Sequence, residues 1–291
     1  MLTAMLIASG AVVSVFWRTT PPAASTVPVP ASANEPAAEP VITGPVGAVT
    51  IASPRVGDPP GYARIPKPAV PDGPRRVGIQ VGHWQTQNVP PELRILETQT
   101  GTSWNGIIEW EVSLDIAMRV KAQLEAKGLA VDILPTTIPA GYLADVFVSL
   151  HSDGDGVGSA SGYKLAHSSR RTPYEDQLQR DLSEEYGAAT GLGVDPSVTR
   201  NMINYFAFVW SRYRTATSPF TPSVILEMGF LSNDHDRALL TEEPDVVATG
   251  IANGIERFLG EVPSTQLFGQ DLLVAPFRPG GSPLSSPSAR P

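Results

Sequence analysis

The sequence predicts an α/β fold of three layers, in which a central sheet is covered by helices on both faces. Segments with strand patterns alternate along the chain with longer segments of helical periodicity, as in α/β domains. The strand segments are near-continuous apolar runs, which is typical of strands buried on both faces. Three of these runs end in a polar residue: His83, His151 and Glu227. Ligands of such sheets collect at the carboxyl ends of the strands, so these residues are candidates for a functional site.

The predicted elements follow from local patterns. Apolar residues at every fourth position from Ile108 to Leu124 predict a helix, and Gly128 is expected to end it. Alternating or continuous apolar runs rich in β-branched residues predict the strands. The strands are expected at residues 75–84, 129–136, 144–151, 162–168 and 223–229, and the helices at 106–128, 174–190 and 244–259.

Proline marks the limits of the globular part. Of the 29 prolines, 14 lie in residues 1–75 and 6 in residues 262–291, and such ends cannot bury enough apolar surface to offset the entropy of ordering. We therefore expect one domain at residues 75–260, preceded by a Pro/Ala-rich linker and followed by a Pro/Ser-rich tail. The linker is expected at 19–74 and the tail at 261–291. One apolar stretch of the tail, "LFGQDLLVAPF", could dock on the domain, although a disordered tail is the main expectation.

Composition excludes several classes of function. The chain has no cysteine, which removes thiolate metal sites, cysteine nucleophiles and disulfides. A net charge of −8 without a basic run in the central span argues against a nucleic-acid partner. The first 17 residues are uncharged and mostly apolar, so residues 1–18 are expected to be a signal peptide or a membrane anchor. We therefore expect the protein to be exported to the cell envelope or the extracellular space, either free or tethered to the membrane by its N-terminus. A monomer is favoured.

The two histidines at strand ends suggest a shared metal ion. A single histidine in such a position is more often structural, but two in matching positions, among four in the chain, favour metal binding. A zinc hydrolase needs three protein ligands and an open position, and two histidines with one glutamate form a standard set. Glu109 and Glu111 begin the first long helix. Spacing alone does not decide whether Glu109 binds metal or only stabilises the helix dipole.

Glu227 interrupts an apolar strand in "PSVILEMGFLSN". A carboxylate beside a metal could take a proton from the attacking water and return it to a leaving amine. A nearby cation would also offset its burial. The structural alternative is an ion pair with Arg212 or Arg214. The catalytic interpretation is favoured because Glu227 ends a strand in the same way as the two histidines.

These motifs together resemble the zinc-dependent N-acetylmuramoyl-L-alanine amidases of the amidase_3 type, over residues 76–260. "VGIQVGHW" resembles the strand of that family that ends in Gly-His, and "EWEVSLDIAMRVKAQLEAKGLAVDIL" its helix and following strand. "ADVFVSLHSDG" is similar to the Ser-Ile-His-Ala-Asn strand, and "PSVILEMGFLSN" to the motif Glu-x-Gly-Phe-Leu-Ser-Asn. The resemblance implies an amidase-like fold with a mixed sheet.

The resemblance also implies a site and a reaction. His83, Glu109 and His151 would bind one Zn²⁺ per domain, and Glu227 would be the catalytic glutamate. The substrate would be peptidoglycan, cut at the amide between N-acetylmuramic acid and L-alanine of the stem peptide. Two other hypotheses stay open at this point. One is a non-catalytic wall-binding or regulatory module, and the other is a zinc carboxypeptidase that holds a terminal carboxylate with Arg200, Arg212 or Arg214.

The chain departs from the family pattern at several positions. Gln80 stands where an aspartate usually precedes Gly-His, and Trp84 replaces a glycine just after it. The connection from Ile133 to Ala144 is short and lacks the usual arginine-bearing helix. Two histidines have no counterpart in the family motifs: His167 could line the cleft, and His235 is expected to be a solvated residue at a helix start.

Overall fold

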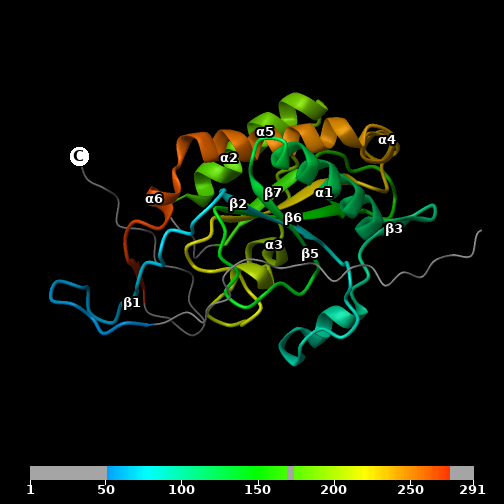
Figure 1. The fold of residues 1–291 in the computed structure, drawn as a ribbon. Coiled ribbons are helices and arrows are strands. Elements are labelled where there is room, and N and C mark those ends of the chain that lie inside the picture. Colours follow the sequence, from blue (N-terminus) through cyan, green and yellow to red (C-terminus); the bar gives the residue numbers. More distant parts are fainter. Residues whose placement is uncertain (1–50, 169–173, 276–291) are drawn as a thin grey trace, which may run out of the picture. The chain divides into compact units, whose positions relative to one another are not determined.

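The core of the protein is a five-stranded sheet with the order β5-β2-β6-β8-β7 (Figure 1). The computed structural model describes residues 51–168 and 174–275. The chain divides into two units, Met1–Glu39 and Pro40–Pro291, and all described residues belong to the second. The signal or anchor segment predicted at 1–18 lies outside the described residues. No helix in the described ranges is long and apolar enough to cross a membrane.

The sheet is mixed, as the family resemblance implied. Four strands run parallel, and β7 is antiparallel to β8 at one edge. Every strand predicted from the sequence is present within a few residues of its expected bounds. The strands are β2 (Arg76–Val81), β5 (Ala130–Leu134), β6 (Val146–Asp153), β7 (Lys164–His167) and β8 (Ser223–Phe230).

Long helices cover one face of the sheet. In Figure 1 they lie above the strands, with α5 against both α1 and α2. Gly250 and Gly254 make the contact of α5 with α2 possible, because a Cβ at Gly254 would stand 2.7 Å from the Cα of Leu182. The predicted stop of the first helix is confirmed, since Gly128 has a φ of 82° just beyond it. The helices are α1 (Glu109–Glu125), α2 (Glu175–Thr190), α4 (Asp234–Glu242) and α5 (Pro244–Glu261).

The opposite face is covered by short helices and loops around a second apolar cluster. Phe147 of β6 and Ile225 of β8 point into this cluster, while the residues beside them point into the main core. Both faces of the central strands are therefore buried, and the fold class predicted from the sequence is confirmed. The short helices are α3 (Arg200–Ile203) and the 3₁₀ segments η1 (Pro91–Thr98) and η2 (Phe206–Phe208).

Chain segments on both sides of residues 75–260 also take part in the fold. β1 (Ala63–Ile65) pairs in antiparallel fashion with β9 (Leu272–Val274), and α6 (Ser264–Leu267) precedes β9. Ion pairs from Arg64 to Asp58 and Asp271 add to this ribbon. The apolar stretch of the tail thus docks in part on the domain, because Leu267 and Phe268 belong to the main core.

The docking of the tail can be tested at Phe268, which is 1% exposed. Phe268→Ala is expected to lower the free energy of unfolding by about 3 kcal/mol, since it removes a large buried side chain and leaves a cavity. Urea denaturation of the full chain measures the change. Leu273→Ala in β9, at a position 43% exposed, serves as the control and is expected to cost less than about 0.5 kcal/mol. Equal effects of the two substitutions would contradict the docking of the tail.

Candidate metal centre

The three polar candidates from the apolar strands come together toward the carboxyl ends of β2, β6 and β8. The expectation that each ends its strand is wrong for two of them, because β6 continues past His151 to Asp153 and β8 continues past Glu227 to Phe230. His151 of β6 and Glu227 of β8 are register partners on neighbouring parallel strands, so their side chains leave the sheet on the same face. His83 lies two residues beyond Val81, whose partner in β6 is Leu150. The carboxyl ends of β2, β6 and β8 thus bring the three candidates to one place, as parallel pairing predicts.

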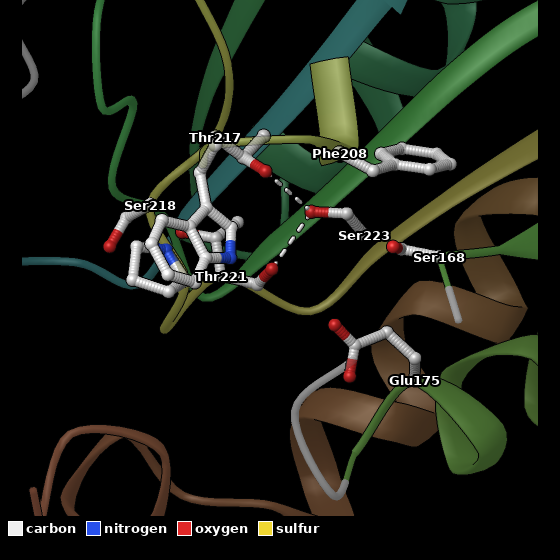
Figure 2. Close-up of a pocket in the computed structure, with 9 residues that line it drawn as sticks. Ser168, Glu175, Phe208, Thr217, Ser218, Thr221 and Ser223 are labelled. Carbon is white, nitrogen blue, oxygen red and sulfur yellow. Dashed lines mark hydrogen bonds between the residues drawn. The ribbon is translucent and has the colours of Figure 1, made fainter. Parts of the chain in front are cut away.

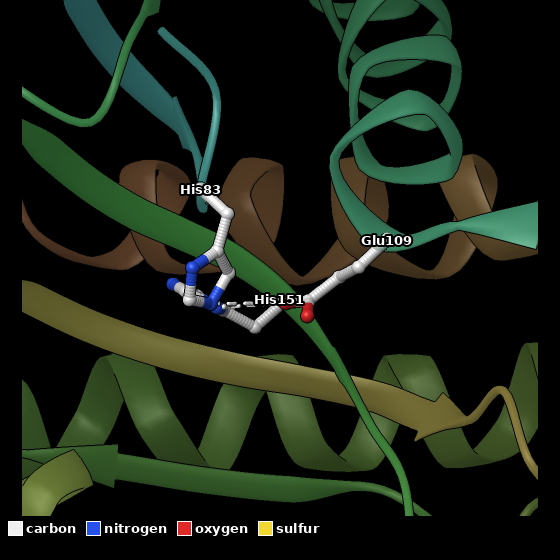
Figure 3. A group of neighbouring side chains, drawn as sticks. All are labelled: His83, Glu109 and His151. Atoms are coloured by element: carbon white, nitrogen blue, oxygen red, sulfur yellow. Dashed lines mark hydrogen bonds and ion pairs between the residues drawn. The ribbon is translucent and has the colours of Figure 1, made fainter. Parts of the chain in front are cut away.

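His83, Glu109 and His151 form a group that could hold a metal ion. Each offers one ligand atom, and these atoms all lie within 4.8 Å of one another. Oε1 of Glu109 lies 2.9 Å from Nδ1 of His151 and 3.6 Å from Nε2 of His83. Figure 3 shows the carboxylate of Glu109 reaching from the start of α1 toward the two imidazole rings.

A short hairpin places Glu109 in this group. β3 (Ser103–Trp104) and β4 (Ile107–Ile108) lead directly into α1, whose first residue is Glu109. Its carboxylate is 2% exposed and accepts hydrogen bonds from two backbone amides, Thr102 N at 2.6 Å and Ser152 N at 3.2 Å. Glu111 is exposed. Of the two acids that begin the helix, only Glu109 reaches the histidines.

The Gly-His turn is equally constrained. A Cβ at Gly82 would lie 2.2 Å from Cε1 of His151, so only glycine lets β2 end so close to that ring. His83 itself has a φ of 59°, in the left-handed region that costs most residues free energy. Its Nδ1 lies 2.8 Å from the backbone oxygen of Gln99. A carbonyl only accepts hydrogen bonds, so Nδ1 carries the proton and Nε2 is free to bind a metal.

Burial and charge act against each other within the group. Burial would raise the pKa of Glu109, but the hydrogen bond with His151 and the two imidazoles hold that pKa below its usual value. Burial alone would lower the pKa of His151, yet the contact with Glu109 raises it. The pKa of His83 is lowered, chiefly by burial. Without a metal, Glu109 is therefore ionised and His151 tends to carry the compensating proton.

The group fits a zinc ion. It supplies two imidazole nitrogens and one carboxylate oxygen, which is a common ligand set of catalytic zinc and leaves a position open for water. Each ligand is also held by a second contact, from Gln99 to His83 and from two backbone amides to Glu109. Such second contacts fix ring orientation and tautomer in metal sites.

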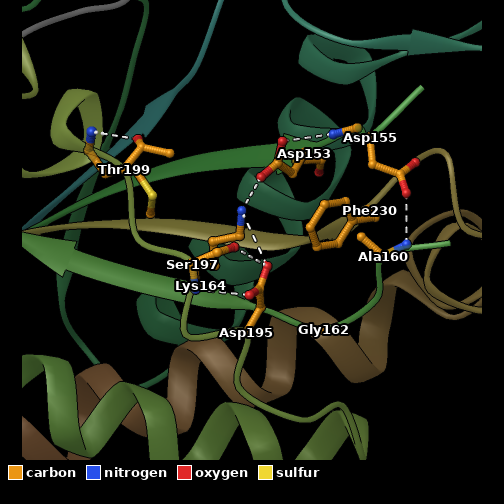
Figure 4. A network of polar contacts seen from close by, with 12 residues as sticks. Asp153, Asp155, Ala160, Gly162, Lys164, Asp195, Ser197, Thr199 and Phe230 are labelled. Carbon is orange, nitrogen blue, oxygen red and sulfur yellow. Dashed lines mark hydrogen bonds and ion pairs between the residues drawn. The ribbon is translucent and has the colours of Figure 1, made fainter. Parts of the chain in front are cut away.

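Glu227 stands between His151 on one side and Lys164 of β7 on the other, as its register partners. Burial is the main reason that its pKa rises to about 7. In the ranges that the structure describes, neither Arg212 nor Arg214 forms an ion pair with it. Lys164 pairs with Asp153 and, at 3.4 Å, with Asp195, and lies over the ring of Phe230 (Figure 4). Lys164, the register partner of Glu227 in β7, thus forms its ion pairs with two other acids.

Two residues near the centre carry no site prediction from the sequence. Tyr205, in the loop between α3 and η2, places its hydroxyl 3.2 Å from Nε2 of His151 and 2.9 Å from Oε1 of Gln80. No sequence motif marks Tyr205. In the sequence, Gln80 stood out only as a departure from the family pattern. In the structure it is fully buried and contacts Tyr205. Trp84, the other departure, packs partly buried against the main core.

The remaining histidines lie elsewhere. His167 pairs with Val224, the second residue of β8, and its Nε2 lies 2.9 Å from Asp176 in α2. It is therefore at the opposite end of the sheet from Glu227, and the expectation that it lines the cleft is wrong. The expectation for His235 is confirmed, because it is an exposed residue in the first turn of α4.

A small pocket lies apart from the four candidate site residues (Figure 2). Hydroxyl side chains dominate its wall, and Oγ of Ser223 lies 3.2 Å from Thr217 Oγ1 and 2.8 Å from the backbone oxygen of Thr221. None of the four candidate site residues lines it. Its lining consists of Ser168, Glu175, Phe208, Trp210, Thr217, Ser218, Pro219, Thr221 and Ser223.

Comparison with known proteins agrees with the family resemblance. The sequence profile of the N-acetylmuramoyl-L-alanine amidase family Amidase_3 matches residues 77–257. The chain belongs to this family. A curated member, the N-acetylmuramoyl-L-alanine amidase LytC of Bacillus subtilis, is 26% identical over 178 residues, which cover 54% of this chain and 32% of LytC. The chain thus matches about a third of the length of that relative.

Solved structures of family members are similar as well. The amidase Ami1 of Mycobacterium smegmatis has 21% identity and a TM-score of 0.49, covering 65% of this chain and 98% of its own. The catalytic domain of CwlV, an amidase from Bacillus (Paenibacillus) polymyxa var. colistinus, has 22% identity and a TM-score of 0.43, covering 64% of this chain and 98% of its own.

The raised pKa of Glu227 predicts a pH-dependent stability of the metal-free protein. Its pKa is about 7 in the folded state and about 4.5 when unfolded, so folding takes up a proton between these values and stability falls as pH rises through that window. Glu227→Gln removes this penalty. The variant is expected to exceed the metal-free wild type by at most about 3 kcal/mol at pH 8 and by less than about 1 kcal/mol at pH 5.

Urea denaturation at the two pH values, in the presence of chelator, measures the difference. Glu111→Gln changes an exposed acid at the start of α1 and is the matched control. It is expected to show the same small change at both pH values. A stability gain of Glu227→Gln that does not grow with pH would contradict the raised pKa.

Proposed function

We propose that the protein is a peptidoglycan hydrolase that cleaves the amide between N-acetylmuramic acid and L-alanine of the stem peptide. One observation carries the proposal: a largely buried group of two imidazoles and a carboxylate, beside an acid in register, near the carboxyl ends of the strands in a member of the amidase family. Of the residue roles, His83, Glu109 and His151 are proposed as metal ligands and Glu227 as the catalytic base.

The proposed cofactor is one Zn²⁺, held by Nε2 of His83, the carboxylate of Glu109 and Nδ1 of His151. When bound, zinc supplies a Lewis acid and lowers the pKa of a coordinated water to about 7. The contribution of the protein is the fixed position of the ligands. The hydrogen bonds of Glu109 and His83 to backbone groups hold these side chains in place before a metal arrives.

The proposed task of Glu227 is proton transfer. A general base works best when its pKa lies near the working pH, and burial brings the pKa of Glu227 to about 7. As a carboxylate it would accept the proton of the attacking water. As a carboxylic acid it would then return that proton to the amine of L-alanine, so that the leaving group departs neutral.

The setting of the reaction is part of the proposal. The predicted signal or anchor at residues 1–18 would export the enzyme, and the linker would give the catalytic domain reach into the wall, where peptidoglycan is its partner. The catalytic residues are proposed to lie within residues 75–260 of a larger folded unit, and a monomeric state is likewise proposed. The described ribbon of β1 and β9 ties chain from both flanks to the domain.

Product analysis separates this function from its rivals. Muropeptides are incubated with the zinc-loaded full chain, with and without chelator, and the products are identified by mass spectrometry. Intact stem peptides with a free L-alanine amine, absent when chelator is added, are expected. Shortened stem peptides still joined to muramic acid would identify a carboxypeptidase. Zinc binding without any product would favour a wall-binding module.

Glu227→Ala tests the base. The variant is expected to lose about 10²- to 10⁴-fold in turnover, because it removes the group proposed to exchange the proton. Its zinc content, measured by atomic absorption after dialysis, is expected to equal that of the wild type. Loss of zinc together with turnover would count against the assigned role.

Glu109→Gln tests the ligand set. This variant is expected to lose bound zinc, since it replaces a buried carboxylate that lies between the two imidazoles. The same substitution two residues later, Glu111→Gln, changes an exposed acid and is expected to leave zinc content and turnover unchanged. A zinc content that falls equally in both variants would refute the assignment.

A further inference from the structure

A chain of hydrogen bonds runs from the interior of the sheet to His151. It begins at the backbone oxygen of Thr136, which lies 2.8 Å from Nε2 of Gln80. Oε1 of Gln80 lies 2.9 Å from the hydroxyl of Tyr205, and this hydroxyl lies 3.2 Å from Nε2 of His151. Nε2 is the ring nitrogen of His151 that does not contact Glu109, because Glu109 lies beside Nδ1.

The orientation of the Gln80 amide is fixed. Its side chain is 0% exposed in β2, so water cannot offer it other partners. The backbone oxygen of Thr136 only accepts hydrogen bonds, so the NH₂ group of Gln80 must face it and Oε1 must face Tyr205. Thr136 is itself held, because its backbone N donates to the oxygen of Trp84 at 2.9 Å.

This orientation determines the direction of the next bonds. Tyr205 has one hydroxyl proton, and Oε1 of Gln80 can only accept it. The hydroxyl oxygen therefore presents lone pairs to His151, and Nε2 of His151 must donate. Without a metal, Nδ1 of His151 also carries a proton, which it donates to the carboxylate of Glu109. When a metal displaces that proton, the proton on Nε2 stays, and the neutral imidazole has its free lone pair on Nδ1, beside Glu109 and within reach of His83.

We infer that Gln80 and Tyr205 are positioning residues that fix the Nε2–H tautomer of His151 and so prepare its Nδ1 as a metal ligand. The inference rests on the proposed metal centre. Gln99 has the corresponding role for His83: its backbone carbonyl holds the proton on Nδ1, which leaves Nε2 free to bind the metal. The two ligands thus bind through different ring nitrogens.

The inference also explains the departure at position 80. A residue in this place must donate to Thr136 and accept from Tyr205, and an amide side chain does both. An aspartate, which usually precedes Gly-His in the family, has no proton to offer to the carbonyl when ionised. Gln80 and Tyr205 therefore act as a pair, and loss of either is expected to release the tautomer of His151.

Zinc affinity of the full chain, measured by competition with a chromophoric chelator, tests the pair. Tyr205→Phe removes the acceptor for Nε2–H, and Gln80→Met removes the acceptor for the tyrosine proton, which can then turn toward His151. Each is expected to bind zinc about 10- to 100-fold more weakly. Tyr213→Phe removes a hydroxyl from the same aromatic cluster, away from His151, and is expected to leave the affinity unchanged.

A direct measurement does not depend on the stability of the variants. In the ¹⁵N-histidine NMR spectrum of the zinc-loaded wild type, His151 is expected to show a one-bond proton coupling at Nε2 and none at Nδ1. A proton on Nδ1 would overturn the inference. So would variants that lose stability in urea but keep the zinc affinity of the wild type, since a purely structural role would move only stability.

The outcomes separate the inference from the proposed function. If the wild type binds zinc and both variants bind it equally well, the positioning role is refuted and the amidase proposal stands. If the wild type does not bind zinc at all, both are refuted. If it binds zinc but releases no L-alanine stem peptide, the positioning role is still decided by the affinities.

Discussion

The interaction on which the site depends is the buried contact of Glu109 with two imidazoles. A carboxylate that is 2% exposed is stable only with compensating charge and hydrogen bonds, and it finds both at the ends of β2 and β6. The local conformation of several neighbouring segments serves this contact. The β3–β4 hairpin delivers the helix start, Gly82 admits the ring of His151, and His83 takes a left-handed backbone conformation to reach the same point. These constraints cost free energy locally, and the stable sheet behind them makes that cost tolerable.

The sheet register supplies the second half of the arrangement. Lys164, Glu227 and His151 are successive partners across β7, β8 and β6, so one row of the sheet holds a cation, an acid and a candidate ligand. Lys164 is engaged by Asp153 and Asp195, and its charge only partly offsets the burial of Glu227. The raised pKa of Glu227 therefore follows chiefly from burial, and the engagement of Lys164 with two other acids limits how far its charge offsets that effect.

Much of this could be predicted from the sequence, because periodicity and parallel pairing are local or nearly local properties. The five strands, the three long helices and the convergence of His83, His151 and Glu227 follow from apolar runs and from the rule for strand ends. The choice of Glu109 over Glu111 needed either a family resemblance or coordinates, since only two residues separate the buried acid from the exposed one within the first turn of α1. Tyr205 could not be found, because it reaches His151 from an irregular loop whose path no periodicity records. The ribbon of β1 and β9 was missed for a related reason: prolines flank it, and strands of three residues leave almost no pattern.

The positions that break local rules gather at one edge of the sheet. An acid lies within the apolar strand β8 at Glu227, an amide lies in the buried interior at Gln80, and a non-glycine residue takes positive φ at His83. Each would be a defect in a protein built for stability alone, and such exceptions are expected at functional sites. At this edge they compensate one another, since Gln80 satisfies Tyr205, Tyr205 satisfies His151 and His151 offsets the charge of Glu109. Glu227 is the member left without a hydrogen-bonding partner of this kind in the part of the chain that the structure describes. Because its neighbours are engaged with one another, Glu227 is the acid that we propose exchanges a proton with a bound substrate.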